Sequence, residues 1–170
     1  MERVLIVGSP GSGKSFLARR LAAATGLPAV HLDRHYWAPG WIEPSPEDWH
    51  TRLASLVDRP RWIIDGNYPA TLGLRLARAD TAIFLDVPRS VCLTRVLRRT
   101  LRGLGRERGD DIAPGCPERI DLPFLRYVWH FSRDHRGRVA RALESFPGRV
   151  IVLRSGRDVA AFVNSIARGA

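Results

Sequence analysis

The chain has 170 residues, of which 45% are hydrophobic, so it can bury the core of one domain and is too apolar for a disordered protein. No apolar run approaches the about 20 residues of a membrane-spanning helix, and residues 1–7 lead into a glycine-rich motif rather than a signal peptide, so we expect a cytoplasmic protein with no membrane partner. The net charge of +10 allows for anionic substrates or for a nucleic-acid partner.

A buried strand followed by a glycine-rich loop is the first predicted feature. Residues 4–7 are all apolar, as in a strand buried on both faces, and residues 8–15 fit the spacing G-x-x-x-x-G-K-S/T without a mismatch. An amphipathic helix is expected over about residues 13–25, with Gly26 ending it. Because a phosphate loop stands between a strand and a helix, this order predicts binding of a nucleoside triphosphate, with ATP as the expected cofactor.

Each residue type in this loop has a chemical reason. Glycines let the backbone turn and bring N–H groups toward phosphate oxygens, and the positive end of the helix adds to the attraction. Lys14 is expected to reach the β- and γ-phosphates, and the Ser15 hydroxyl to bind Mg²⁺. Lys14 is the only lysine among 27 lysines and arginines, so the compact ammonium occurs only where a phosphate loop uses one. The predicted nucleotide contacts in the loop are Gly8, Ser9, Pro10, Gly11, Ser12, Gly13, Lys14, Ser15 and Phe16.

Carboxylates stand at the ends of three further predicted strands. These strands are expected over residues 29–32, 61–64 and 81–87. Asp33 and Asp65 come directly after the first two. The carboxyl ends of parallel strands meet at the crevice where open α/β sheets bind ligands, so both carboxylates are candidate site residues. Asp86 lies near the end of the third strand, and we expect it to cap the next helix.

Tryptophan and proline are frequent in the segment after Asp33, and residues 36–44 are too irregular for a helix. Its aromatic side chains, Trp37 among them, either fill space in the core or line a substrate pocket, and the sequence leaves both open. Ser45 is expected to cap a following helix that has proline at its first position.

The second half of the chain is rich in arginine and contains the longest predicted loop. Helices are expected over residues 90–101, from 121, over 138–143 and over 158–167, with a strand over 149–153. The polar stretch 102–120 is longer than an ordinary connection, so it is either a lid or a disordered insert. Cys92 and Cys116 lack the partners of a zinc site, and no disulfide is expected. The alternation of strands and helices predicts a single α/β domain over residues 1–170, with a parallel sheet covered on both faces.

Several motifs in series resemble the P-loop kinases of the adenylate-kinase-like group, and most closely the bacterial proteins labelled DNA topology modulation proteins or adenylate kinase-like ATPases. The resemblance is carried by GSPGSGKS from residue 8, HLDRHYW from 31, WIIDGNY from 62 and RLARADTAIFLDVP from 75, and by an arginine-rich helix. It implies a three-layer α/β/α P-loop NTPase fold with five parallel strands in the order 2-3-1-4-5. It also implies an acceptor-binding region over residues 34–60 and a lid over 102–120.

The resemblance further implies roles outside the phosphate loop. Arg95 and Arg99 lie on the helix that leads into the lid and are expected to bind phosphates, with Arg98 as the competitor of Arg99. Gly156 lies in a loop that is expected to pack against adenine, and Asp65 is expected to hold the shell of Mg²⁺ through water. The implied acceptor contacts are Asp33, Trp37, Asp65, Gly66, Asn67 and Arg75.

The predicted function is phosphoryl transfer from ATP, with Mg²⁺, to a nucleotide or a small hydroxylated acceptor. Lys14, Arg95 and Arg99 supply positive charge, and Asp33 orients or deprotonates the acceptor hydroxyl. The region after Asp33 is shorter and richer in tryptophan than the AMP-binding helices of adenylate kinases, which leaves open a smaller acceptor, as in shikimate- or gluconate-type kinases. One alternative is a nucleotide-dependent regulator associated with nucleic acid, which the family label suggests and the charge of +10 permits. A second is an ATPase without an acceptor.

Overall fold

Five parallel strands form the centre of the computed structural model, which describes residues 1–107 and 109–169. The strands are β1 (Arg3–Gly8), β2 (Ala29–His31), β3 (Trp62–Asp65), β4 (Thr81–Leu85) and β5 (Arg149–Leu153). Their order in the sheet is β2-β3-β1-β4-β5, and every neighbouring pair is parallel. This confirms the predicted fold class and strand order.

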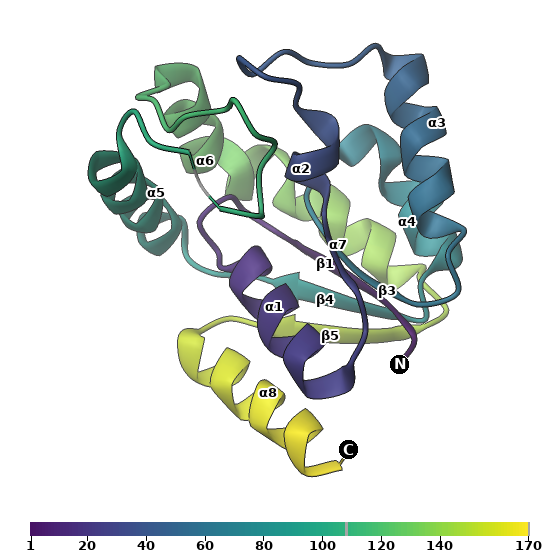
Figure 1. The fold of residues 1–170 in the computed structure, drawn as a ribbon. Helices are drawn as coiled ribbons and strands as arrows, with labels where there is room; N and C mark the ends of the chain where they lie inside the picture. The colour runs from purple at the N-terminus through teal and green to yellow at the C-terminus, as the bar shows by residue number, and fades with distance from the viewer. Residues whose placement is uncertain (108, 170) are drawn as a thin grey trace.

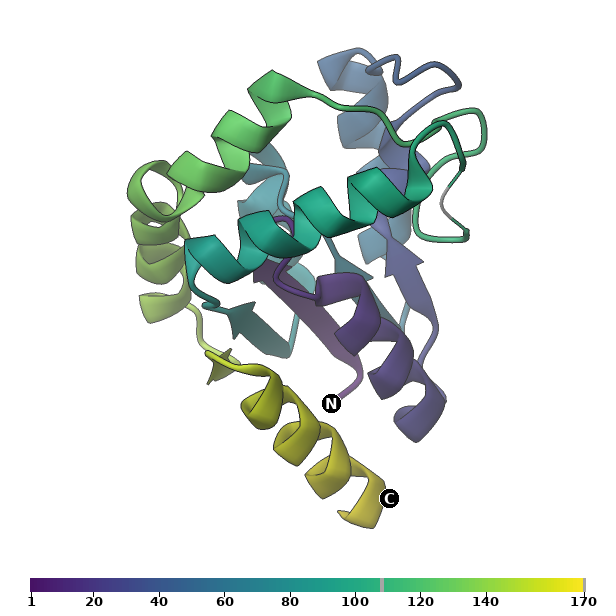
Figure 2. The same cartoon turned by 90° about the vertical axis from the view of Figure 1, so that its left-hand side faces the viewer.

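Helices cover both faces of the sheet (Figure 1). They are α1 (Lys14–Thr25), α2 (Leu32–Tyr36), α3 (Pro46–Val57), α4 (Leu72–Arg78), α5 (Arg89–Gly103), α6 (Leu122–Asp134), α7 (Arg136–Glu144) and α8 (Gly156–Gly169), with a 3-10 turn over Pro69–Thr71. α1 and α8 lie side by side on one face, and α3, α4 and α7 contribute to the core on the other. Figure 2 shows α5 beside α6 and crossing over the loop that leads into α1. In the described part of the chain, no helix is long and apolar enough to cross a membrane.

The alternating side chains of β1 divide the core between the two faces of the sheet. Leu5 and Val7 belong to the cluster that contains α3, α4 and α7, whereas Val4 and Ile6 belong to the cluster that contains α1 and α8. All four side chains are at most 1% exposed, which confirms a strand buried on both faces.

The register of the strands gathers their carboxyl ends around one residue. Asp65, the last residue of β3, is opposite Ile6 of β1 on one side and opposite His31 of β2 on the other. The phosphate loop leaves β1 two residues after Ile6, so it begins beside the end of β3. The polar groups of β2, β3 and the phosphate loop therefore meet in the crevice where open α/β sheets bind ligands.

The chain after β2 differs from the prediction. β2 ends at His31 and α2 follows at once, so Asp33 lies in the first turn of a short helix rather than after a strand. Leu32, the first residue of this helix, is fully buried. At the end of the helix, the Trp37 N–H bonds the Asp33 carbonyl (3.4 Å). A helix of five residues is too short for its periodicity to be recognised in the sequence.

Asp86 does not cap α5, contrary to the prediction. The N-cap residue is Pro88, and the Asp86 carboxylate accepts two hydrogen bonds from Arg136, from Nε and from Nη2, both at 2.7 Å. These bonds hold the pKa of Asp86 below its ordinary value. A bidentate guanidinium pair binds a carboxylate more strongly than one backbone N–H, so Asp86 ties the end of β4 to α7 instead.

The long connection between α5 and α6 is partly buried. Residues 104–121 form no helix or strand among those described, and isolated bridges join the two ends of the segment. Ile112, Ala113 and Cys116 are at most 4% exposed, so this polar stretch contains a buried cluster that its composition did not reveal. Cys92 and Cys116 are both free thiols, as predicted.

Arg75 is fully buried and shapes the loop that follows β3. Its guanidinium donates to the carbonyl oxygens of Gly66 (2.8 Å), Asn67 (2.6 Å) and Tyr68 (2.8 Å). Burial lowers the pKa of Arg75 to about 10, which leaves the side chain charged at neutral pH. Arg75 is 0% exposed, so in this structure it positions the loop, including Tyr68, whose φ of 26° is unusual for a residue other than glycine. The contact of Arg75 with the acceptor stays a prediction.

Replacing Arg75 tests this role. Arg75→Met leaves one buried and two partly buried carbonyl groups without their donor, and we expect it to lower the free energy of unfolding by about 3 kcal/mol or more in urea titration. Arg78→Met, one turn later on α4, removes only an exposed ion pair with Asp58 and is the matched control, with an expected loss below about 1 kcal/mol. Equal losses in the two variants would contradict the assignment.

Candidate functional site

The phosphate loop forms a tight turn between β1 and α1. The Ser12 N–H bonds the Ser9 carbonyl across the turn (3.0 Å), and Gly13, with φ of 103°, precedes the first residue of α1. Gly11 packs directly on α5, because a Cβ there would lie 2.3 Å from the Cys92 carbonyl oxygen. A glycine is required at this position by space as well as by its φ of 80°.

Lys14 reaches back across the loop. Its Nζ donates to the carbonyl oxygens of Gly8 (2.8 Å) and Ser9 (3.1 Å). Burial lowers the pKa of the ammonium below its ordinary value, against the opposing attraction of Asp65 and Asp33. The one compact cation of the chain is thus held where the loop N–H groups and the N-terminus of α1 favour an anion.

Ser15, Asp65 and His31 form a hydrogen-bonded chain at the ends of β2 and β3. The Ser15 hydroxyl donates to Asp65 Oδ2 (2.8 Å), and His31 Nδ1 lies 2.6 Å from Asp65 Oδ1. Burial disfavours the charged form of the His31 ring, but the hydrogen bond and the charge of Asp65 outweigh it and raise the pKa of His31. Asp65 is only 4% exposed, so the carboxylate is oriented by both neighbours.

The Ser15–Asp65 pair is a suitable donor set for Mg²⁺ beside a polyphosphate. Both ligand types are oxygens, and Mg²⁺ is usually held by one or two carboxylates, waters and substrate phosphates rather than by a protein cage. The described residues contain no group of three or more His, Cys, Asp or Glu side chains that could hold a metal by themselves. The predicted roles of Ser15 and Asp65 therefore fit the geometry.

Asp33 lies on the same side of the crevice and is oriented by a tyrosine. The Tyr68 hydroxyl donates to Asp33 Oδ1 (2.6 Å), and burial of the phenol, then the charge of Asp33, raises the pKa of Tyr68. Asn67 Oδ1 accepts the N–H of Gly8 (3.2 Å), and its side chain also bonds Tyr127 of α6. The loop after β3 thus links the phosphate loop, α2 and α6 around Asp33.

Four arginines on one side of α5 line a hollow of about 560 Å³ next to the phosphate loop. They are Arg95, Arg98, Arg99 and Arg102. Arg95 Nη1 donates to the carbonyl oxygens of Ser12 (3.1 Å) and Gly11 (3.5 Å), so it lies on the loop itself. Arg98 and Arg99 both line the hollow, and the charge of Arg99 also acts on Lys14. The α5 surface therefore presents a concentrated positive charge beside the predicted phosphate site.

The remaining predicted contacts lie at the edges of this arrangement. Phe16 is 56% exposed on α1. Gly156 is the first residue of α8, and a Cβ added there would meet no atom within 4 Å. Trp37 packs edge-on against Trp41, with ring centroids 5.4 Å apart, and both contact the buried cluster of residues 104–121. Gly66 packs closely on Leu32 of α2.

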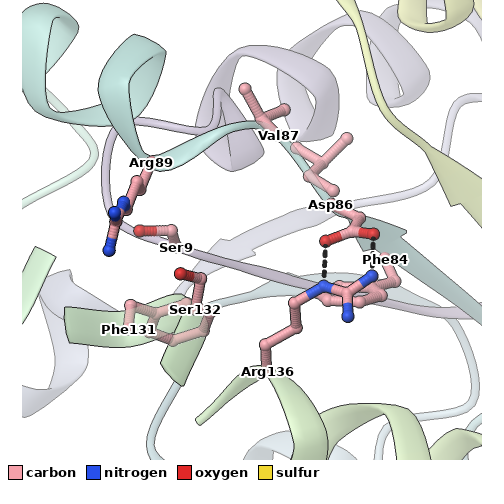
Figure 3. A pocket seen from close by; sticks show the side chains of 9 residues that line it. Ser9, Phe84, Asp86, Val87, Arg89, Phe131, Ser132 and Arg136 are labelled. Carbon is pink, nitrogen blue, oxygen red and sulfur yellow. Dashed lines mark hydrogen bonds and ion pairs between the residues drawn. The ribbon is translucent and has the colours of Figure 1, made fainter. Parts of the chain in front are cut away.

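A second cavity, lined in part by Ser9, is too small for a nucleotide (Figure 3). Its volume is about 10 Å³, close to the minimum that holds one water molecule. Figure 3 shows Ser9, Arg89 and Ser132 around it, with the Asp86–Arg136 pair closing one end. Its lining brings Ser9 of the phosphate loop close to Ser132 of α6 and to Arg136 of α7.

Sequence reasoning missed three residues that orient the site. His31 lies inside a quoted motif as the last residue of β2, so its position at a strand end could have indicated it. Tyr68 likewise lies inside a motif, as the last residue of WIIDGNY. Tyr127 had no signal, because it reaches Asn67 only through the packing of α6 over the loop.

No protein-family model matches this chain, and no curated protein matches its sequence. The predicted membership among DNA topology modulation proteins therefore stays a prediction.

Solved kinase structures have the same fold. A shikimate kinase from Acinetobacter baumannii in complex with shikimate is 17% identical with a TM-score of 0.62, over 99% of this chain and 92% of that one. A gluconokinase from Sinorhizobium meliloti 1021 is 17% identical with a TM-score of 0.56, over 99% and 94%. A deoxyadenosine kinase from M. mycoides is 12% identical with a TM-score of 0.55, over 98% and 97%. At these identities the likeness is one of fold, and along nearly its whole length the chain has the fold of P-loop kinases.

Proposed function

We propose that this protein is a phosphotransferase that moves the γ-phosphoryl group of ATP, in the presence of Mg²⁺, to a hydroxyl of a small acceptor. The observation that carries the proposal is the convergence of Lys14, the Ser15–Asp65 pair and Asp33 at the carboxyl ends of β1, β2 and β3. The fold supports the same class, because kinases with three different acceptors share it.

The phosphate loop and α5 bind the donor. Lys14 leaves the carbonyl oxygens of Gly8 and Ser9 for the β- and γ-phosphates, and Arg95 and Arg99 add positive charge from α5. Ser15 and Asp65 are the residues that would hold Mg²⁺, and the ion supplies neutralisation of the phosphate oxygens when bound. Positioning and charge, rather than covalent chemistry by the protein, lower the barrier.

Asp33 acts on the acceptor. It orients the hydroxyl and accepts its proton as the hydroxyl oxygen bonds to the γ-phosphorus and the bond from this phosphorus to the β,γ-bridging oxygen breaks. The products are the phosphorylated acceptor and ADP. Tyr68 holds one carboxylate oxygen of Asp33, so the other is available to the acceptor. Trp37, Gly66 and Asn67 are proposed acceptor contacts, and Gly156 is proposed to pack against adenine.

The acceptor is proposed to be small, such as a hydroxylated metabolite or a nucleoside. Residues 34–60 are the proposed acceptor-binding region, and residues 102–120 the proposed lid that excludes water from the reaction. The neighbours supply three starting candidates, shikimate, gluconate and deoxyadenosine. Arg75 is the proposed partner of an acceptor phosphate, and to serve there it would have to leave the loop carbonyl oxygens that it now binds.

Lys14→Ala tests the donor site. We expect ATP turnover to fall by about 1,000-fold while the melting temperature stays within a few degrees, because the ammonium is used at the phosphates and lies outside the core. The control is Arg20→Ala, which removes an exposed cation from the same helix. Near-normal turnover in Lys14→Ala would refute the donor site.

Asp65→Asn tests the metal position. The amide keeps hydrogen-bonding capacity but loses the charge, so the Mg²⁺ concentration for half-maximal ATP turnover is expected to rise by about 10-fold or more. Titration of Mg²⁺ against ATP binding provides a second readout. Asp58→Asn changes an exposed carboxylate and is expected to leave the Mg²⁺ dependence unaltered. An unchanged dependence in Asp65→Asn removes the residue from the metal site.

An acceptor panel tests the transfer step. ADP production is measured with shikimate, gluconate, deoxynucleosides and nucleoside monophosphates, each against the acceptor-free rate. We expect at least one small hydroxylated compound to raise the rate, and Asp33→Asn to remove this increment while sparing acceptor-free hydrolysis. A rate that no compound raises identifies an ATPase without an acceptor.

A further inference from the structure

The two segments proposed to bind acceptor and to form the lid are joined in one packed unit. Trp37 and Trp41, which follow α2, contact the buried side chains of Ile112, Ala113 and Cys116 in the loop between α5 and α6. We call these five residues the lid cluster. In Figure 1 the loop between α5 and α6 comes down beside α2. Cys116 is fully buried, so the cluster is a small core of its own rather than a surface contact.

Directed hydrogen bonds fix the relative position of the two segments. The Gly40 N–H bonds the Gly115 carbonyl (2.7 Å), and the Trp41 indole Nε1 donates to the Pro117 carbonyl (2.9 Å). Gly115 also lacks room for a side chain, because a Cβ there would lie 2.7 Å from Pro39 Cβ. The segment after α2 and the returning half of the loop therefore move together.

The residue after Pro117 connects this unit to α5. Glu118 is 5% exposed, its Oε1 lies 3.0 Å from Arg99 Nε, and its Oε2 accepts the Thr100 hydroxyl (3.1 Å). Its backbone is also held, since the Gly105 N–H bonds the Glu118 carbonyl (2.9 Å). A carboxylate this deeply buried is strongly unfavourable unless it is paired, so the nearby charge of Arg99 stabilises it and draws the two side chains together.

Arg99 is the point at which this connection meets the phosphate site. Its side chain is 34% exposed and lines the arginine hollow beside Arg95, which itself bonds the Ser12 carbonyl of the phosphate loop. A long arginine side chain has many rotamers, and holding it in one of them removes the entropy that binding otherwise costs. The carboxylate that holds it comes from the lid and not from its own helix.

We propose that Glu118 is a positioning residue for phosphoryl transfer, which orients Arg99 toward the transferring phosphate and couples that orientation to the segment after α2 through Trp41 and Pro117. This inference rests on the proposed phosphotransferase function. The inference adds to that function a residue that contacts neither substrate. It also makes the orientation of Arg99 depend on the position of the acceptor segment.

A double-mutant cycle between Glu118 and Arg99 tests the proposal. The probes are ADP with Mg²⁺, and ADP with Mg²⁺ and aluminium fluoride, which mimics the transferring phosphoryl group. In Glu118→Gln we expect affinity for the aluminium fluoride complex to fall by about 10-fold or more, with affinity for ADP and Mg²⁺ changed by less than about 3-fold. In an Arg99→Ala background, the same substitution is expected to change neither affinity by more than about 2-fold.

Two further variants separate positioning from loop stability. Trp41→Phe keeps an aromatic ring in the lid cluster but removes the donor to Pro117, and we expect a loss of about 3-fold for the aluminium fluoride complex only when Arg99 is present. Glu107→Gln makes the same acid-to-amide change in the same loop. The Glu107 side chain accepts the Gly115 N–H, which an amide oxygen can also accept, so this variant is expected to leave both affinities unchanged. If Glu118→Gln melts below the assay temperature, the double-mutant cycle is measured with Trp41→Phe and Arg99→Ala instead.

The outcomes distinguish this inference from the function on which it rests. Equal losses for Glu118→Gln with and without Arg99, or a loss for ADP and Mg²⁺ as large as for the aluminium fluoride complex, assign Glu118 a purely structural role and overturn the proposal. A wild-type protein that binds neither complex, or whose binding is indifferent to Lys14→Ala, instead refutes the phosphotransferase function itself.

Discussion

The carboxylate of Asp65 accepts hydrogen bonds from both sides, and the rest of the site depends on this arrangement. Ser15, at the start of α1, donates to one oxygen, and His31, at the end of β2, contacts the other. The strand order places β3 between β1 and β2, so Asp65 at its end can bridge the phosphate loop and the end of β2. At 4% exposure the carboxylate has little freedom to leave these partners, which fixes the first turn of α1 relative to β2.

The features that the sequence predicts are those that follow from local sequence. The phosphate loop needs glycines and one lysine at fixed spacing, and the candidate carboxylates come at or just after the ends of buried strands. The predicted cap role of Asp86 was wrong, and the loop contacts of Arg75 were not foreseen, because the partners of both residues are not indicated by their local sequence. Arg136 is 50 residues from Asp86, and the carbonyl oxygens that bind Arg75 belong to the loop before α4. A single sequence does not show which of many arginines pairs with which group, so such contacts emerge only from packing.

Arginine serves three distinct purposes in this chain, which explains why its abundance alone predicts little. Arg75 is a buried donor to backbone carbonyls, Arg136 is half of a bidentate ion pair, and Arg95 lies on the phosphate loop. Each use exploits the planar, permanently charged guanidinium. The net charge of +10 therefore contains structural as well as surface charge and is a poor measure of affinity for nucleic acid. Lys14 also donates to backbone carbonyl oxygens, but it stands at the position where a phosphate loop requires a compact charge.

The lid cluster joins the proposed acceptor-binding segment to the proposed lid. If the proposed acceptor segment and the proposed lid were independent, each ligand would order only its own segment. Binding of one ligand would then leave the affinity for the other unchanged. Here Trp41 and Glu118 belong to one hydrogen-bonded unit that ends on Arg99. A ligand that stabilises the segment after α2 then also reduces the ordering cost of the donor site, and by linkage the donor favours acceptor binding to the same extent. Under the proposed function, coupling of this kind favours phosphoryl transfer over hydrolysis, because a bound acceptor and an oriented Arg99 stabilise the same unit.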